Sequence, residues 1–306
     1  MASNHLANIP AEFLPQHQQN KELEDSAHIT TASLFYEQDS SDTEENCGES
    51  SSAFHDATQN VTICNQTYNL MCPPDVGTLF AHQVWSGSKL LSSYLVGNSE
   101  TLVRNKRTVE LGAGTGLPSL VALSNGSSFS LITDYPDESV LNSLRETVGL
   151  NWNTCRSISR VNVVGHEWGE DVTKLMEGAA ERSTLCASND RDSSSFSDDK
   201  QQYGGDRESF YFDTCILSEC LWMHSTHTAL AKSIDKLLHP QRGVAIVTYA
   251  HHIPGKEKED DSFFEICELD KFGGFVTDHI CTQSMSYMWD SSKTIDVHLK
   301  VMTRSC

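Results

Sequence analysis

The stretch Thr-Val-Glu-Leu-Gly-Ala-Gly-Thr-Gly-Leu-Pro, residues 108–118, joins a β-like run to a helical one. Residues 108–111 are typical of a strand, and glycines at 112, 114 and 116 follow directly. Glycine lets a backbone approach a ligand, and the next helix points its N-terminal amides at that ligand. Pro118 suits the first helical turn, where a missing N–H costs no hydrogen bond. The turn indicates a nucleotide-type ligand, with a tight turn lacking any ligand as the alternative.

The spacing around the glycines narrows the class of ligand. Dinucleotide-binding folds use G-x-G-x-x-G, whereas Leu117 stands where the third glycine would fall, and Glu110 replaces the usual apolar residue before the turn. No Lys-Ser or Lys-Thr pair follows the glycines, which excludes a P-loop. Asp134 ends the next strand about twenty residues later and is placed to bind both hydroxyls of a ribose. A turn residue ahead of Pro136 is the alternative reading of Asp134.

Short apolar runs alternate with helical spacing along the rest of the chain. Strands are expected at 108–111, 129–133, 161–164, 213–217, 243–249, 275–281 and 294–302, and helices at 115–124, 137–151, 226–238 and 263–272. Strand and helix in alternation indicate a parallel sheet with helices on both faces. The last two strands have no helix between them. We therefore predict an α/β, Rossmann-like, doubly wound seven-stranded sheet, mostly parallel with a C-terminal antiparallel hairpin.

Charge and composition divide the chain. The net charge of the 306 residues is -20, and residues 1–60 carry half of it, with eleven acids and one base. Too few apolar residues there offset the entropy of ordering. We therefore expect a disordered acidic tail over 1–59, a folded domain over 60–306, and a low-complexity inserted loop at about 186–208. So acidic a chain argues against nucleic-acid binding. It favours a basic partner, although solubility alone is the commoner reason for such a charge.

The same composition indicates a cytoplasmic protein. No apolar run approaches the ~18 residues needed to cross a bilayer, and the N-terminus lacks the pattern of a secretory signal. The ten cysteines include no Cys-x-x-Cys pair, and Cys215 and Cys220 lie in apolar surroundings. Thiols used as small buried hydrophobes are typical of a reducing compartment. We therefore expect no membrane partner.

Beyond the glycine turn, five segments carry a resemblance: Val84–Gly87, Thr133–Asp137, Gly165–Gly169, Leu217–Ser225 and Tyr249–Gly255. With them, the chain resembles the class I, seven-strand S-adenosylmethionine methyltransferases over roughly residues 60–304. It is most similar to the branch of protein lysine methyltransferases and nicotinamide N-methyltransferase-like proteins. The nearest subgroup methylates the N-terminal glycine and adjacent lysine of translation elongation factor 1-alpha.

This resemblance implies S-adenosylmethionine as the cofactor. The expected cofactor-binding residues are Trp85, Glu110, Gly112, Ala113, Gly114, Asp134, Tyr135, Trp168 and Ser218. Two positions depart from the family. Glu219 stands where related members usually have aspartate, and Ser86 stands where they usually have asparagine or alanine. Glu219 reaches one methylene further than aspartate, so the geometry at the transferred methyl group is left open.

Methyl transfer to nitrogen needs a neutral amine lone pair aligned with the methyl group and shielded from water. Amines with a pKa of about 8 to 10 must first lose a proton. Open α/β sheets bind ligands beyond the carboxyl ends of their strands, where the catalytic candidates Glu219, Trp222, His224 and Tyr249 fall. Glu219 could orient the amine or accept its proton, and aromatic faces could hold a cationic amine.

Plainer readings of several candidates stay open at this point. Trp222 could be a core aromatic, Trp168 could pack at the edge of the core, and His224 could cap the helix that starts near Thr226. His251 and His252 could serve only a turn. No metal site is expected, because no cysteine or carboxylate stands at ligand spacing from these histidines.

Three functions remain under consideration. The favoured one is an S-adenosylmethionine-dependent N-methyltransferase acting on a protein lysine or N-terminal amine, with elongation factor 1-alpha as the substrate that the resemblance suggests. A small-molecule, nicotinamide-like N-methyltransferase is the second, with Val61 to Gly77 as its lid or only an extra hairpin. The third is a non-catalytic cofactor-binding module, which the unusual Glu219 favours.

Overall fold

The computed structural model describes residues 57–72, 80–155, 160–179, 210–287 and 290–305. Its strands are β1 (Ala57–Ile63), β2 (Gln66–Cys72), β3 (Arg107–Leu111), β4 (Phe129–Asp134), β5 (Val161–Gly165), β6 (Thr214–Ser218), β7 (Val244–Ala250), β8 (Phe275–Tyr287) and β9 (Asp290–Arg304). Within the described residues, β1 and β2 form a separate hairpin, and the other seven form one sheet in the order β5-β4-β3-β6-β7-β9-β8.

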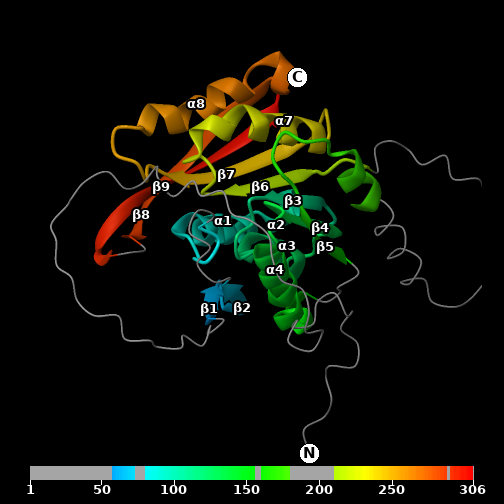
Figure 1. Ribbon diagram of the computed structural model, residues 1–306, viewed down its shortest axis with the longest axis vertical. Coiled ribbons are helices and arrows are strands. Elements are labelled where there is room, and N and C mark those ends of the chain that lie inside the picture. Colours follow the sequence, from blue (N-terminus) through cyan, green and yellow to red (C-terminus); the bar gives the residue numbers. More distant parts are fainter. Residues whose placement is uncertain (1–56, 73–79, 156–159, 180–209, 288–289, 306) are drawn as a thin grey trace, which may run out of the picture.

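The helices lie on both faces of this sheet (Figure 1). They are α1 (Ser86–Gly97), α2 (Ser99–Leu102), α3 (Leu117–Ser124), α4 (Glu138–Leu150), α5 (Trp152–Cys155), α7 (His227–Leu237) and α8 (Glu257–Cys267), with 3-10 turns η6 (His224–Thr226) and η7 (Asp270–Phe272). One hydrophobic core joins α1, α3 and α4 to the sheet, and a second joins α7 and α8 to the opposite face. This arrangement confirms the predicted doubly wound fold.

The central strands are apolar because both of their faces are covered. All six residues of β4 and four of the five residues of β6 are buried. The five strands from β5 to β7 pair in parallel, while β9 is antiparallel to both β7 and β8. The predicted C-terminal antiparallel hairpin is therefore confirmed.

Helix α8 begins earlier than the sequence predicts, and strands β8 and β9 are longer, because the added residues are mostly polar. Helix α8 begins at Glu257 rather than near residue 263, and its first turn carries Glu257, Glu259 and Asp260. Acidic side chains stabilise a helix N-terminus through the helix dipole, but they do not produce the apolar spacing from which a helix is predicted. Strands β8 and β9 likewise run beyond the predicted 275–281 and 294–302, because most side chains of β8 are exposed and carry no hydrophobic alternation.

The β1–β2 hairpin packs on helix α4 rather than standing free. Tyr68 and Leu70 are buried in the same core as α1, α3 and α4. The side-chain amide of Asn151 accepts from the backbone N–H of Asn69 (2.9 Å) and donates to its carbonyl (2.6 Å). One asparagine thus supplies the pair of hydrogen bonds that a neighbouring strand would supply. Of the segment weighed as a lid, the described part is an extra hairpin.

The described fold begins at Ala57, three residues before the boundary expected from composition. The remainder of the expected tail and the expected inserted loop at 186–208 lie outside the described residues. No helix within the described ranges has the length and apolar character to span a bilayer.

The sheet order reverses between β3 and β6. From β3 the chain proceeds outward to β4 and β5 on one side, and then returns to β6 and β7 on the other. The loops that leave the carboxyl ends of β3 and β6 therefore diverge, and such a switch point is where open α/β sheets bind ligands.

Candidate functional site

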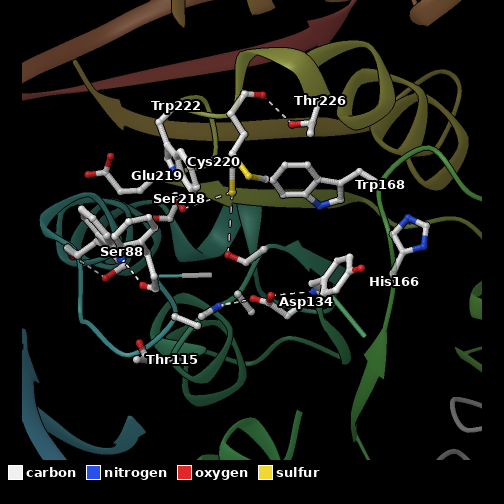
Figure 2. Close-up of a pocket in the computed structure, with 18 of the residues that line it drawn as sticks. Ser88, Thr115, Asp134, His166, Trp168, Ser218, Glu219, Cys220, Trp222 and Thr226 are labelled. Atoms are coloured by element: carbon white, nitrogen blue, oxygen red, sulfur yellow. Dashed lines mark hydrogen bonds between the residues drawn. The ribbon is translucent and has the colours of Figure 1, made fainter. Parts of the chain in front are cut away.

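A cavity of about 900 Å³ lies at this switch point. Its walls come from the loop after β3, the ends of β4, β5 and β6, and the segment that leads into α1 (Figure 2). Four carboxylate side chains are among the described lining residues, and no lysine or arginine is. The cavity is therefore suited to a cation and unsuited to a phosphate-rich ligand.

The glycine loop adopts the conformation that its sequence predicts. Gly112, Gly114 and Gly116 have φ values of 67°, 54° and 74°, in the region that side chains disfavour. A Cβ on Gly112 would lie 2.8 Å from Cys220 Sγ and 3.0 Å from Trp168 Cζ2. Backbone, thiol and indole therefore meet at this point without room for a side chain.

Trp168 and Cys220 form the wall beyond Gly112 and lie side by side in Figure 2. Trp168 lines the cavity and also packs against the core of the α7–α8 face, and its contact with the cofactor stays a prediction. The Cys220 thiol donates to the carbonyl oxygens of Leu111 and Ser218, each at 3.4 Å. Burial raises the pKa of Cys220 well above its ordinary value, so the residue serves as a neutral spacer between β3 and β6.

Asp134 ends β4 and faces the glycine loop. Its Oδ2 accepts from the Gly114 amide and its Oδ1 from the Tyr135 amide, each at 2.7 Å. Burial raises the pKa of Asp134, against the lowering effect of these two amides. Each oxygen keeps a lone pair beyond its amide bond, so the carboxylate can still accept from hydroxyl groups in the cavity.

Glu110 lies beneath the loop and outside the cavity lining. It is 1% exposed, and its Oε2 accepts from the Ser119 amide at the start of α3 (3.0 Å). Its Oε1 has no described partner of hydrogen-bond geometry. Burial raises the pKa of Glu110 to about 8, against the lowering effect of Ser119. The structure therefore places this predicted cofactor residue behind the loop, where it supports α3.

Three aromatic side chains form the opposite wall. The rings of Phe80 and Trp222 meet edge to face with centroids 5.4 Å apart, and those of Phe80 and Trp85 at 6.3 Å. The Trp85 indole donates to the Phe80 carbonyl at 3.0 Å. Trp222 thus lines the cavity rather than the core.

Glu219 lines the same wall, yet its carboxylate is already bonded. It is 6% exposed and accepts from the Gly87 amide, the Ala250 amide and the His252 ring, at 2.9, 3.0 and 3.0 Å. Its φ of 58° lies in the left-handed region. The predicted position of Glu219 at the cavity is therefore observed, and its role in proton transfer stays a prediction.

The other two catalytic candidates lie outside the described cavity lining. His224 binds Asp260 Oδ1 at 2.7 Å rather than capping α7, and His251 binds the second oxygen of Asp260 at 2.8 Å. Tyr249 is 2% exposed and donates its hydroxyl to Asp261 at 2.6 Å. These residues tie α8 to the ends of β6 and β7.

The remaining cofactor candidates gather as predicted. Ala113, Tyr135 and Ser218 line the cavity together with the residues above. Residues that the sequence analysis did not single out also line it: Phe80, Thr115, Asp137, His166, Glu167 and Met223. Among the described residues, no three histidine, cysteine or acidic side chains are arranged to hold a metal ion.

The donor set fits S-adenosylmethionine. Asp134 supplies a carboxylate for a ribose, Trp168 supplies an aromatic face, and the acidic lining without lysine or arginine suits a sulfonium cation. A dinucleotide would bring a pyrophosphate instead, and the described lining holds no lysine or arginine to neutralise it.

Comparison with known proteins agrees with this geometry. The model of the lysine methyltransferase family matches residues 65–186. The protein N-terminal and lysine N-methyltransferase efm7 of Schizosaccharomyces pombe is 28% identical over 214 residues, which cover 70% of this chain and 71% of that protein. The protein of the same name from Yarrowia lipolytica is 31% identical over 199 residues, which cover 61% of this chain and 62% of that protein.

These matches span about two thirds of the length of the relatives. The residues that the family model matches include the glycine loop and Asp134, which line the cavity. The chain is therefore an S-adenosylmethionine-dependent methyltransferase, and it is similar to the proteins that the lysine methyltransferase family model describes.

Proposed function

We propose that the protein methylates an amine of a protein substrate, either a lysine side chain or an N-terminal α-amine. The observation that carries this proposal is the aromatic wall of Phe80, Trp85 and Trp222 on an acidic cavity. Aromatic faces attract a cationic amine, and the edge of a tryptophan or phenylalanine packs closely on its aliphatic carbons. The names of the related proteins support the same chemistry.

S-adenosylmethionine supplies an electrophilic methyl group when bound. The chain contributes orientation: the glycine loop and Asp134 hold the cofactor side, and the aromatic wall holds the amine side. Loss of the amine proton is favoured beside a cation in a site that excludes water, and a positioned amine gains the rate advantage of a unimolecular step. The fixed aromatic rings serve to exclude water and to align the lone pair.

The acidic lining also favours a basic segment of the substrate. Asp137 and Glu167 lie on the side of the cavity formed by β4 and β5, so positive residues next to the methylated amine would meet opposite charge there. Elongation factor 1-alpha, with its N-terminal glycine and adjacent lysine, is the substrate to test first. We further propose that the protein acts in the cytoplasm, where such a substrate is made.

The test uses labelled S-adenosylmethionine and three forms of an elongation factor 1-alpha N-terminal peptide. One form is unmodified, one is acetylated at the α-amine, and one carries arginine in place of the lysine. Mass spectrometry locates each methyl group. Methylation of the unmodified peptide, lost in one or both blocked forms, identifies the acceptor amine.

Free nicotinamide and a cell lysate complete the experiment. Label in a different protein of the lysate would support protein methylation and would identify that protein as the substrate in place of elongation factor 1-alpha. Label in nicotinamide alone would overturn the proposal in favour of a small-molecule enzyme. Cofactor binding without any transfer would indicate a binding module.

A further inference from the structure

We infer that Glu219 is a positioning residue that latches the start of α1 to the ends of β6 and β7, and thereby sets Trp85 in the cavity wall. The Glu219 latch is defined by Glu219, Gly87, Ala250 and His252. The inference rests on the proposed amine methylation only in its kinetic test, because its structural test needs no substrate.

The carboxylate is shared between two elements. Oε1 accepts from the amide of Gly87, the second residue of α1, at 2.9 Å. Oε2 accepts from the amide of Ala250, the last residue of β7, at 3.0 Å, and pairs with His252 Nε2 at 3.0 Å. Both oxygens are engaged, and one of them lies at a helix N-terminus, which favours negative charge.

The other polar group of Gly87 is bonded to the sheet as well. The Thr248 hydroxyl of β7 donates to the Gly87 carbonyl at 3.0 Å. Backbone N–H of Glu219 in turn donates to the Thr248 carbonyl at 2.8 Å. The peptide groups on both sides of Gly87 are therefore fixed by the carboxyl ends of two neighbouring strands.

Gly87 and Glu219 are matched in size. A Cβ on Gly87 would lie 2.5 Å from Glu219 Oε1 and 2.8 Å from its Cδ. Glu219 has a φ of 58°, in the left-handed region that residues other than glycine disfavour. The extra methylene of glutamate, relative to aspartate, lets Oε1 reach the space that a Cβ on Gly87 would occupy.

The latch reaches the cavity wall through Trp85, two residues before Gly87. The Ser88 hydroxyl donates to the Trp85 carbonyl at 2.7 Å. The Trp85 ring packs edge to face on His252 with centroids 5.0 Å apart, and its indole holds the Phe80 carbonyl at 3.0 Å. His252, which bonds Glu219, therefore also supports the tryptophan that lines the cavity.

This geometry separates the latch from general-base catalysis. Taking an amine proton would weaken these bonds, because protonation removes negative charge and an acceptor position from a carboxylate that already accepts three hydrogen bonds. An engaged carboxylate is better suited to hold a backbone in place than to exchange protons with a substrate.

The experiment compares Glu219→Gln with Gly87→Ala, and uses Gly97→Ala in the same helix as the matched control. A Cβ on Gly97 meets nothing within 4 Å. Gly87→Ala moves the Glu219 carboxylate and leaves its chemical identity unchanged. Hydrogen exchange of residues 80–97 is measured without substrate, and kcat, KM and the pH profile are then measured with the acceptor peptide.

The latch predicts that both variants speed amide exchange at the start of α1 and raise KM for the peptide by about tenfold, with kcat within threefold and the pH profile unmoved. The Gly87→Ala, Glu219→Gln double variant should have a KM no higher than that of the more strongly affected single variant, because both substitutions break the same contact. Thr248→Val, a milder change, should shift exchange and KM in the same direction by less.

Two results would overturn the inference. One is native exchange at the start of α1 in both Gly87→Ala and Thr248→Val. The other is a Glu219→Gln enzyme that loses kcat while exchange and KM stay native. That second result would make Glu219 the proton acceptor. Failure of every peptide to be methylated would remove the proposed substrate and leave the exchange test standing.

Discussion

The two halves of the cavity are built in opposite ways. The cofactor half comes mainly from one short stretch, the loop at 112–116, with Asp134 bonded to its Gly114 amide. The proposed acceptor half is assembled from two segments far apart in the sequence, represented by Trp85 and by Glu219 with Trp222, and His252 supports it from outside the lining. The first half depends on backbone conformation, which local sequence dictates. The second half depends on side chains from different elements, and a variant can therefore damage either half alone.

The largest effect should come from Gly114→Arg, which breaks the cofactor half alone. The arginine would occupy a position with φ of 54°, and its side chain would bring a positive charge into an acidic cavity. We expect S-adenosylmethionine affinity measured by calorimetry to fall by at least about a hundredfold, or ~2.8 kcal/mol. Gly97→Arg, at an exposed position in α1, should bind as the native protein does. Native affinity in the Gly114 variant would remove the loop from the cofactor site.

Glu110→Gln tests the support beneath the cofactor half. The folded-state pKa of about 8 exceeds the ordinary 4.5, so the folded chain holds more protons than the unfolded chain between these values. Its stability therefore falls as pH rises through that window. Glutamine cannot ionise. Between pH 5 and pH 8 the unfolding free energy of the variant should therefore rise relative to that of the native protein, by on the order of a few kcal/mol.

Denaturant unfolding at pH 5, 6.5 and 8 measures this difference, with Glu177→Gln at an exposed site as the control. A stability difference between Glu110→Gln and the native protein that stays constant across pH would contradict the raised pKa.

Trp222→Ala breaks the acceptor half alone. It removes the edge-to-face contact with Phe80 and one aromatic face for the amine. We expect KM for the acceptor peptide to rise by about tenfold, or ~1.4 kcal/mol, with S-adenosylmethionine affinity within twofold of native. Trp222→Phe should restore most of the loss. Equal losses in both affinities would show that the two halves are not separable.

The smallest effect should come from Asp137→Ala, at the N-cap of α4. Asp137 Oδ1 accepts from the amides of Ser139 and Val140, at 2.9 and 3.3 Å. Loss of this cap should cost about 1 kcal/mol of unfolding free energy, read from denaturant unfolding. Asp137→Asn should recover most of it, since asparagine caps comparably. A large loss of cofactor affinity in both variants would instead assign Asp137 a direct contact.

The sequence predicted the fold well where its signals are local. The strands β3, β4 and β6 and the helix α4 lie within about two residues of the positions expected from apolar spacing. The start of α8 was missed, because its first turn is stabilised by acids rather than by a buried face. The sequence does not distinguish a lid from a hairpin over β1 and β2, because the hydrogen bonds that hold Asn69 of β2 come from Asn151, far along the chain.

The sequence by itself determined the glycine loop, the place of Asp134 at the end of a strand, and the succession of strands and helices along the chain, because positive φ and hydrophobic period are properties of neighbouring residues. Only the tertiary structure decided that Glu110 lies behind the loop, that Tyr249 points to Asp261, and that Glu219 meets Gly87 across 132 residues. Such contacts depend on which strands are adjacent and which way a side chain leaves its strand. Local sequence spacing determines neither of these. For Glu110, Tyr249 and Glu219 the residue type therefore indicated the kind of chemistry, and tertiary packing decided which groups each side chain contacts.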